Sequence, residues 1–175
     1  MSAADDARAA LVTLRRRVGD HFAAAQARSP DAMQCRSGCA DCCRVRFGVF
    51  GVEAEPIALA LAELGRRDPQ MRARVRAQAD DPRHGACALL VDDRCTVYDA
   101  RPLICRSHGL AVRVRDEAGG ARIDCCPLNY RETDAPAPSV LELAAVEAPL
   151  SVIARMYEPA AERVELAALA RATDD

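Results

Sequence analysis

The sequence is poor in aromatic residues and has no marked excess of charge of either sign. Aromatic side chains make up 3% of the 175 residues, and tryptophan is absent. A protein that stacks single-stranded nucleic acid on aromatic rings is therefore disfavoured. The formal net charge is −2, from 24 basic and 26 acidic residues. We expect no nucleic-acid partner, because such a balance creates no global attraction to polyanions.

Long apolar segments and common catalytic motifs are missing as well. No apolar run approaches the roughly 18 residues that span a bilayer, and the first residues lack the apolar stretch of a secretory signal. We therefore expect a cytoplasmic protein with no membrane partner, in a compartment where thiols stay reduced. A phosphate-binding loop, a Ser-His-Asp order and an HExxH pattern are all absent, so the catalytic residues stay unknown.

Cysteine, in contrast, is abundant, with nine residues. Four of them fall between Gln34 and Arg44, and these are Cys35, Cys39, Cys42 and Cys43. If this stretch is helical, their offsets place all four sulfurs on one helix face. If Gly38 breaks it into a turn, the CxxC of Cys39 and Cys42 can wrap a single ion. Buried free thiols or tight disulfide loops would not explain such crowding.

Two pairs of cysteines are direct neighbours in the chain. Cys42 and Cys43 cannot easily reach one tetrahedral centre without strain, so this pair indicates either a second site or one cysteine that is not a ligand. Cys125 and Cys126, followed by Pro127, raise the same question at the end of an expected hairpin.

A second group of thiols lies between residues 87 and 106. Cys87 and Cys95 flank an Asp-Asp turn and are expected to face each other across a small hairpin. Asp99 is expected to cap a short helix that carries Cys105. Four arginines lie near these thiols in the sequence: Arg44, Arg46, Arg101 and Arg106. They would offset the charge of about −2 that remains when four thiolates bind a divalent ion. An ordinary position on the surface is equally expected for each of them.

The two cysteine groups together resemble a known family. The pattern is CxxxCxxCC from Cys35 to Cys43, then Cys-x-Leu-Leu from Cys87, and Cys-x-Val-Tyr-x-x-Arg-Pro-x-x-Cys-Arg from Cys95 to Arg106. It is similar to the bacterial YkgJ-like cysteine-cluster family, described as zinc- or iron-chelating domains. The resemblance implies metal binding by the matched cysteines. A similar cluster occurs in flagellin lysine methylases, larger enzymes associated with an iron-sulfur cluster, which points toward iron without transferring their activity.

Nine thiols exceed the four that one zinc ion or one four-iron cluster needs. The sequence therefore indicates two sites and leaves the division of the cysteines open. The CxxC spacing favours Zn²⁺, whereas dense thiols and nearby arginines favour an iron-sulfur cluster, for example [4Fe-4S], and we prefer the cluster slightly. His108 follows Cys105 at ligand spacing, but a position just past a helix end explains it better. The candidate metal ligands are Cys35, Cys39, Cys42, Cys43, Cys87, Cys95, Cys105, Cys125 and Cys126.

The expected fold is α+β and mainly α-helical: a single domain, 1–175, with helices packed around the cysteine-rich centre and one or two short β-hairpins. Its core motifs are residues 35–43 and 87–126. Apolar periodicity predicts helices at 5–28, 53–64 ending before Gly65, an exposed 69–79, and two in 140–172, the first interrupted near Pro149. A short strand is predicted in 45–50 and a hairpin in 110–124 with its turn at 117–120. Residues 173–175 are expected to be a frayed tail.

Three functions compete at this point. The first is a metal-binding protein whose centre is structural or carries metal or electrons, without clear catalytic residues; arginines 44, 101 and 106 would then bind the cofactor. The second is a redox or methyl-transfer enzyme with an open coordination position near His108, Tyr98 or Arg101. The third is a thiol-disulfide switch that uses Cys39 and Cys42. The sequence names no protein partner.

Overall fold

The computed structural model describes residues 2–115 and 119–172, and it confirms the mainly helical α+β class. The helices are α1 Ala3–Arg28, α2 Gly51–Arg67, α3 Pro69–Asp80, α4 Leu103–Ser107, α5 Ala144–Tyr157 and α6 Leu166–Arg171. The strands are β1 Gly48–Phe50, β2 Leu90–Val91, β3 Arg94–Cys95, β4 Ala111–Arg115, β5 Ala121–Asp124, β6 Val140–Glu142 and β7 Arg163–Glu165. Single 3₁₀ turns are η1 Asp41–Cys43, η2 Tyr98–Ala100 and η3 Ala137–Ser139.

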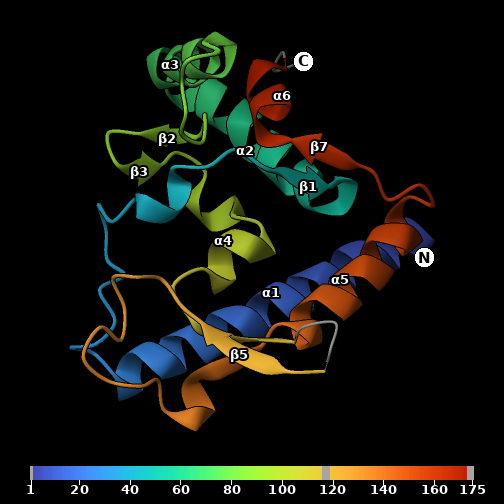
Figure 1. The fold of residues 1–175 in the computed structure, drawn as a ribbon. Coiled ribbons are helices and arrows are strands. Elements are labelled where there is room, and N and C mark those ends of the chain that lie inside the picture. Colours follow the sequence, from blue (N-terminus) through green and yellow to red (C-terminus); the bar gives the residue numbers. More distant parts are fainter. Residues whose placement is uncertain (1, 116–118, 173–175) are drawn as a thin grey trace.

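The elements form two groups with the short helix α4 between them (Figure 1). One group contains α2, α3 and α6 with the antiparallel pairs β1-β7 and β2-β3. The other contains the long neighbours α1 and α5 with the sheet β5-β4-β6, in which β4 runs antiparallel to β5 and parallel to β6. One buried cluster joins α2, α3 and α6 to residues 87–91, and a second joins α1, α2 and α5 to Leu103 of α4. Residues 87–91 and Cys95 thus pack in or against the first buried cluster, and α4, which carries Cys105, is anchored in the second.

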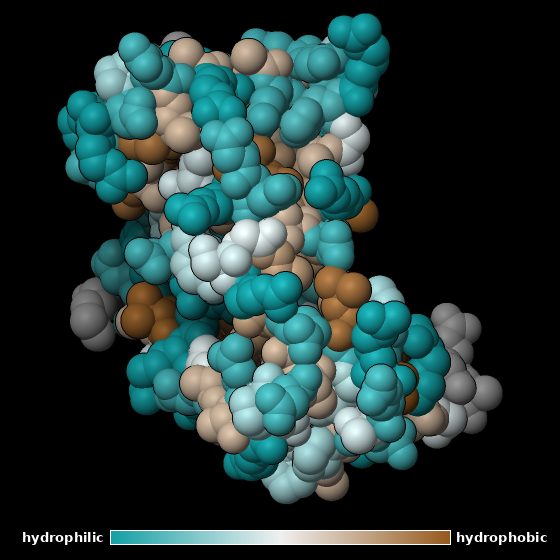
Figure 2. Space-filling view, turned by 90° about the vertical axis from the view of Figure 1, so that its left-hand side faces the viewer, coloured by the Kyte–Doolittle hydropathy of each residue, from teal (hydrophilic) through white to brown (hydrophobic). Residues whose placement is uncertain are grey.

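The face of the molecule drawn in Figure 2 is largely polar. Figure 2 shows that hydrophobic residues on that face occur in small, separate groups among polar ones. Among the described residues, no helix is both long and apolar enough to cross a membrane.

Helix α1 confirms the prediction for residues 5–28 and begins two residues earlier. Ser2 accepts a hydrogen bond from the Asp5 amide, and the Asp5 carboxylate accepts from the Ser2 amide, which forms a capping box. The predicted apolar face is buried against α5, with Leu11, Leu14 and Val18 among its residues.

Helix α2 was predicted to stop at Gly65, and this boundary is wrong. The helix continues to Arg67, and Asp68 then caps α3 by accepting a hydrogen bond from the Met71 amide. A single glycine weakens a helix only by about 1 kcal/mol, and the burial of Leu61 and Leu64 offsets that cost. The expectation that α3 is exposed is also wrong, because Arg72, Val75 and Ala79 are buried.

Arg72 links α3 to the end of α6. Its side chain is 2% exposed, and its guanidinium donates to the carbonyls of Ala170 at 2.6 Å and Ala172 at 2.7 Å. We expect Arg72→Met to lower the free energy of unfolding by about 2–3 kcal/mol, because hydrogen bonds from a charged donor are lost and two carbonyls are left without it. Chemical denaturation measures the change. Arg66→Met is the control, since its exposed pair with Glu63 contributes about 0–1 kcal/mol; equal losses would contradict the role of Arg72.

The C-terminal region differs most from expectation. Residues 140–172 contain α5 and α6 but also β6 and β7, so the prediction of two helices is wrong for about two fifths of the segment. β6 pairs with β4, and β7 pairs with β1, which lies more than a hundred residues earlier. Helix α5 also passes through Pro149 without a break. Packing against α1 compensates for the hydrogen bond that proline removes.

The hairpin predicted in 110–124 is confirmed by the register of β4 and β5, which pairs Val112 with Asp124 and Arg115 with Ala121. The strand predicted in 45–50 is confirmed for its second half as β1. Residues 117 and 118 of the predicted turn and the predicted tail, 173–175, lie outside the described residues.

Candidate metal centre

The first cysteine stretch is a turn followed by a 3₁₀ turn, so the predicted break at Gly38 is confirmed, whereas the binding of a single ion by Cys39 and Cys42 stays a prediction. Gly38 has φ of +88°, a value that suits glycine, and the Cys39 amide donates to the Arg36 carbonyl at 3.0 Å. The 3₁₀ turn η1 follows directly and carries Cys42 and Cys43. The chain therefore reverses between Cys35 and Cys39 and does not stack their sulfurs along one helix.

Cys42 and Cys43 place their sulfurs 4.0 Å apart. The two sulfurs are thus close together, but no third donor in the described part of the chain joins them around one ion, so the expectation of a second site or of one cysteine that is not a ligand stays a prediction. The hydrogen bond between the thiols raises the pKa of Cys42 and, from the other end, lowers the pKa of Cys43. A hydrogen bond between two thiols favours one thiolate in the pair, and the thiolate is the form that binds metals.

Cys87 and Cys95 approach the first stretch by different routes. The Cys87 amide donates to the Cys43 carbonyl at 2.7 Å, which joins the second cysteine group to the first. Cys95 lies on β3 and pairs with Leu90 rather than with Cys87, so the hairpin is shorter than predicted. Its Asp-Asp turn, Asp92 and Asp93 with φ of 51° and 56°, is the tight kind that closes two-residue hairpins.

Helix α4 positions Cys105, but the predicted Asp99 cap is wrong. Pro102 occupies the cap position, and the carboxylate of Glu53 on α2 accepts a hydrogen bond from the Leu103 amide at 2.8 Å. Glu53 is 4% exposed, and burial raises its pKa, while the bond from Leu103 partly opposes that rise. A side chain distant in sequence thus fixes the start of the helix, which is why local patterns did not identify it.

The variant Glu53→Gln should show how burial of this carboxylate makes the free energy of unfolding depend on pH. Its folded-state pKa lies above the ordinary 4.5, so its contribution to stability is present below about pH 4.5 and is lost as the pH rises through the folded-state pKa. Glutamine does not titrate. The free energy of unfolding of the wild type, minus that of Glu53→Gln, should therefore decrease between pH 4.5 and about pH 7 in chemical denaturation. An unchanged or increasing difference would contradict this assignment.

These segments meet at one cavity of about 470 Å³. Its walls include apolar side chains such as Phe47, Leu89 and Val97. Burial raises the pKa of several of its thiols and brings that of Cys105 to about 12. Six of the nine cysteines line it, and we call it the six-thiol cavity: Cys39, Cys42, Cys43, Cys87, Cys95 and Cys105.

The thiols of the cavity are gathered but not closed around one point. Within residues 2–115 and 119–172, no three or more His, Cys, Asp or Glu side chains are arranged so that they could hold one metal ion as they stand. Cys87, Cys95 and Cys105 therefore share one cavity, but as they stand they do not surround a single ion.

Comparison with protein families places all nine cysteines within one known domain family. Residues 34–137 match a family named CxxCxxCC, whose description reads "Putative zinc- or iron-chelating domain". The match spans more than half of the chain. The chain belongs to the CxxCxxCC family. No curated protein and no solved structure matches the chain at a significant level.

The family name implies two residues between its first two cysteines, whereas this chain has three between Cys35 and Cys39. The longer spacing falls in the turn at Gly38. Cys35 is also the one cysteine of the motif that is not among the residues lining the six-thiol cavity.

The arginines predicted near the CxxCxxCC motif take different positions. Arg101 lines the cavity, lies 3.5 Å from the centre of the Tyr98 ring, and lowers the pKa of Cys42 and Cys95 against the larger opposing effects. Arg106 donates to the carbonyls of Arg101 and Asp99. Arg44 pairs with the Asp93 carboxylate at 3.6 Å. Arg46 donates to the Asp81 carbonyl. Of the four, Arg101 is placed to offset charge in the cavity.

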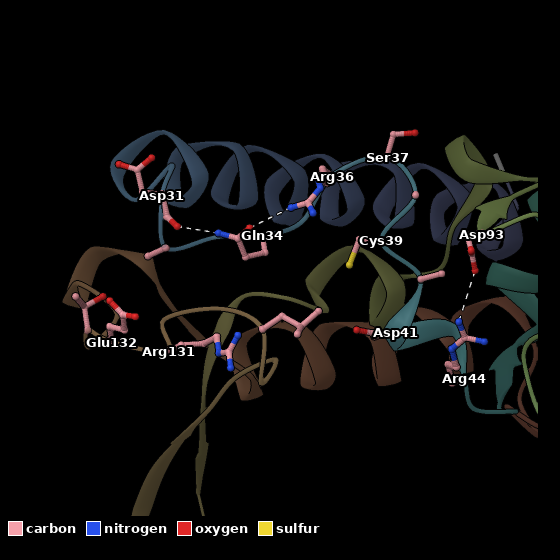
Figure 3. A pocket seen from close by; sticks show the side chains of 15 residues that line it. Asp31, Gln34, Arg36, Ser37, Cys39, Asp41, Arg44, Asp93, Arg131 and Glu132 are labelled. Carbon is pink, nitrogen blue, oxygen red and sulfur yellow. Dashed lines mark hydrogen bonds and ion pairs between the residues drawn. The ribbon is translucent and has the colours of Figure 1, made fainter.

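A larger polar basin of about 750 Å³ adjoins the six-thiol cavity. The turn from Arg36 to Cys39 and the side chain of Asp93 line both spaces. Figure 3 shows the Cys39 sulfur pointing into the open space of the basin, with Arg36, Asp41 and Arg131 around it. Cys39 is therefore accessible from the basin as well as from the cavity.

The other three cysteines of the CxxCxxCC domain are not among the residues that line the six-thiol cavity. Cys125 and Cys126 follow β5 and line a separate cavity of about 440 Å³ together with His108. Burial raises the pKa of Cys125 to about 11 and lowers that of His108. Burial also raises the pKa of Cys35, and Cys126 is the thiol that adds most to this rise. Sequence reasoning did not anticipate Asn129, whose side chain donates to the Cys35 sulfur at 3.3 Å and whose backbone amide donates to the Cys126 carbonyl at 2.9 Å.

Proposed function

We propose that the protein chelates a metal centre in the six-thiol cavity and that this centre is an iron-sulfur cluster. The observation that supports the proposal is the meeting of six thiols from three segments at one cavity. Apart from the Asp93 carboxylate, the acidic and metal-binding groups lining it are thiols, and soft thiolate sets suit zinc and iron-sulfur clusters. The donor chemistry therefore fits the family description.

The spread of the thiols favours a cluster over a lone zinc ion. Zinc at 2.3 Å from each sulfur requires four donors about 3.8 Å from one another. Cys42 and Cys43 have such a separation, at 4.0 Å, but no third described donor joins them around one point. A cluster distributes its cysteines over several irons and so accepts sulfurs that lie farther apart. When bound, it would supply a redox-active or structural centre in a largely apolar pocket.

Anaerobic purification followed by absorption spectroscopy and analysis of iron, sulfide and zinc tests the proposal. We expect a brown protein with a broad band near about 400 nm and with iron and sulfide in similar amounts. A colourless protein with about one zinc in the cavity would overturn the cluster and retain chelation. A folded protein that leaves cells without any metal would overturn both.

A catalytic role is the second candidate, favoured by the polar basin that borders the cavity at Cys39. A redox or methyl-transfer enzyme needs a centre with an open coordination position and room for a substrate beside it. The discriminating observation is whether a small ligand added to the loaded protein changes its spectrum. An unchanged spectrum with every ligand tried, and with all coordination positions filled by cysteine, would exclude this candidate.

A further inference from the structure

Cys39 is the one cysteine that lines the polar basin of about 750 Å³. None of the other eight cysteines, all of which the structure describes, belongs to its walls. Figure 3 shows the Cys39 sulfur pointing into the open space, where the turn at Gly38 places it. The volume of the basin lies within the range of roughly 300–1,000 Å³ that is usual for small-molecule sites. A small molecule in the basin would therefore lie against this sulfur.

Two arginines of the basin have no carboxylate partner among the described residues. Arg36 donates to the neutral side-chain oxygen of Gln34 at 3.0 Å. The Arg131 guanidinium forms no hydrogen bond or ion pair within the part of the chain that the structure describes. Figure 3 shows the two guanidinium groups on opposite sides of the open space, with the Cys39 sulfur between them in this view. Because guanidinium groups bind carboxylates through two parallel hydrogen bonds, the basin offers two places for carboxylates near one thiol.

Acidic side chains line the same basin, and three of them likewise have no cationic partner among the described residues: Asp31, Asp41 and Glu132. Arg44 and Asp93, in contrast, already form an ion pair at 3.6 Å. A simple anion in the basin would meet repulsion from the free carboxylates, and a simple cation would meet repulsion from the free guanidinium groups. A ligand that carries charges of both signs can contact both sets without breaking an existing pair, so a zwitterion fits the basin best.

We infer that the basin binds a zwitterionic low-molecular-weight thiol and that the disulfide form of this thiol modifies Cys39. Such a molecule supplies carboxylates for Arg36 and Arg131, an ammonium group for the acidic side chains, and a sulfur beside Cys39. The Cys39 thiolate attacks one sulfur of the small disulfide. A new S–S bond joins Cys39 to one half, the original S–S bond breaks, and the other half leaves as a thiolate that takes up the proton lost by Cys39. Cys39 is oxidised and the small disulfide is reduced, so no further oxidant is needed.

The modification would act on the six-thiol cavity, because Cys39 lines that space as well. A mixed disulfide removes the thiolate form, which is the form that binds metals. In a protein that holds the proposed cluster, the basin would therefore regulate metal loading, and this consequence rests on the proposed function. Binding in the basin and exchange at Cys39 do not rest on it, since both are measured on metal-free protein.

The rate of exchange at Cys39 in the full-length, reduced and metal-free protein tests the inference. Oxidised glutathione is the zwitterionic probe, because each half carries two carboxylates and one ammonium group, and hydroxyethyl disulfide is the neutral probe. Exchange is quenched with acid, and the modified cysteine is located by mass spectrometry. With each rate divided by the rate in the unfolded chain, oxidised glutathione should modify Cys39 faster than the neutral probe does. This preference should fall about 5–30-fold in Arg36→Gln/Arg131→Gln, since two exposed ion pairs with the ligand are lost.

The matched control is Arg66→Gln/Arg83→Gln, which removes the same charge from exposed side chains that do not line the basin. It should keep the wild-type preference. An equal fall in both double variants, or a wild type that does not distinguish the two probes, would overturn the inference. Modification mainly at another cysteine, or an intramolecular disulfide in place of the mixed one, would overturn it as well.

A measurement on the wild type alone guards against variants that fail to fold. S-methylglutathione keeps the charged groups of the probe but cannot exchange, so it should slow the modification of Cys39 by competition. A rate that stays the same at every concentration of this competitor would overturn the site. A wild type that shows the preference for oxidised glutathione but leaves cells without any metal would overturn the proposed function alone.

Discussion

Replacing Cys42 and Cys43 together by serine is expected to reduce the metal of the six-thiol cavity to less than about a tenth of the wild-type content, since serine is a poor ligand for soft metals. Their sulfurs lie 4.0 Å apart, and the hydrogen bond between them lowers the pKa of Cys43. The double variant thus removes two adjacent donors of the cavity at once. Elemental analysis of anaerobically purified protein measures the loss.

Val45→Ser is the control for this double variant. Val45 lies two residues beyond Cys43, is 55% exposed, and is not among the residues that line the six-thiol cavity. It should keep the wild-type metal content. If the double variant also retains its metal, with circular dichroism showing a folded chain, the centre lies elsewhere and the proposed function fails.

Gly109→Ala is expected to lower the free energy of unfolding by about 2–5 kcal/mol. A left-handed backbone costs a non-glycine residue about 1–2 kcal/mol, and overpacking adds about 1–3 kcal/mol. The added methyl would meet the Cys35 sulfur at 2.5 Å, so Cys35 must turn away and lose its hydrogen bond from Asn129. Chemical denaturation gives the stability, and thiol alkylation should report a more reactive Cys35.

Gly119→Ala separates the two parts of this cost. Gly119 has φ of +84°, and no neighbour among the described residues lies within 4 Å of an added Cβ, so alanine there should cost only the backbone part, about 1–2 kcal/mol. Equal destabilisation by the two variants would show that Cys35 moves aside freely and that the contact at Gly109 is not a constraint.

The sequence predicted best those parts whose structure depends on neighbours in the chain. The long helix α1 follows from apolar residues at helical spacing and from its Ser2 and Asp5 cap. The β4-β5 hairpin follows from alternation on both sides of a short turn. The family follows from two ordered cysteine motifs, and it is confirmed over residues 34–137.

The parts that failed depend on partners far away in the chain. β6 and β7 are short segments with unremarkable propensity, and they are strands because β4 and β1 offer free edges. Glu53 caps α4 from a position 50 residues earlier, so Asp99 looked like the better cap. Tertiary contacts of this kind leave no periodic signal in the sequence.

The division of the cysteines illustrates the same limit within the candidate site. Spacing alone grouped Cys35 with its neighbours in the motif, but the turn at Gly38 sends it to Gly109 and Asn129 instead. Asn129 stands outside both cysteine motifs, so no pattern singled it out. Which thiols line the six-thiol cavity and which do not is therefore a property of the folded chain.

The bond from the Cys87 amide to the Cys43 carbonyl has a consequence for biosynthesis. It closes a loop that contains all of α2 and α3, and Cys105 arrives later still. A ribosome must therefore release at least the first 105 residues before the six thiols can assemble. A metal held by all six thiols would therefore bind only after the segment from Cys39 to Cys105 has been synthesised and has folded.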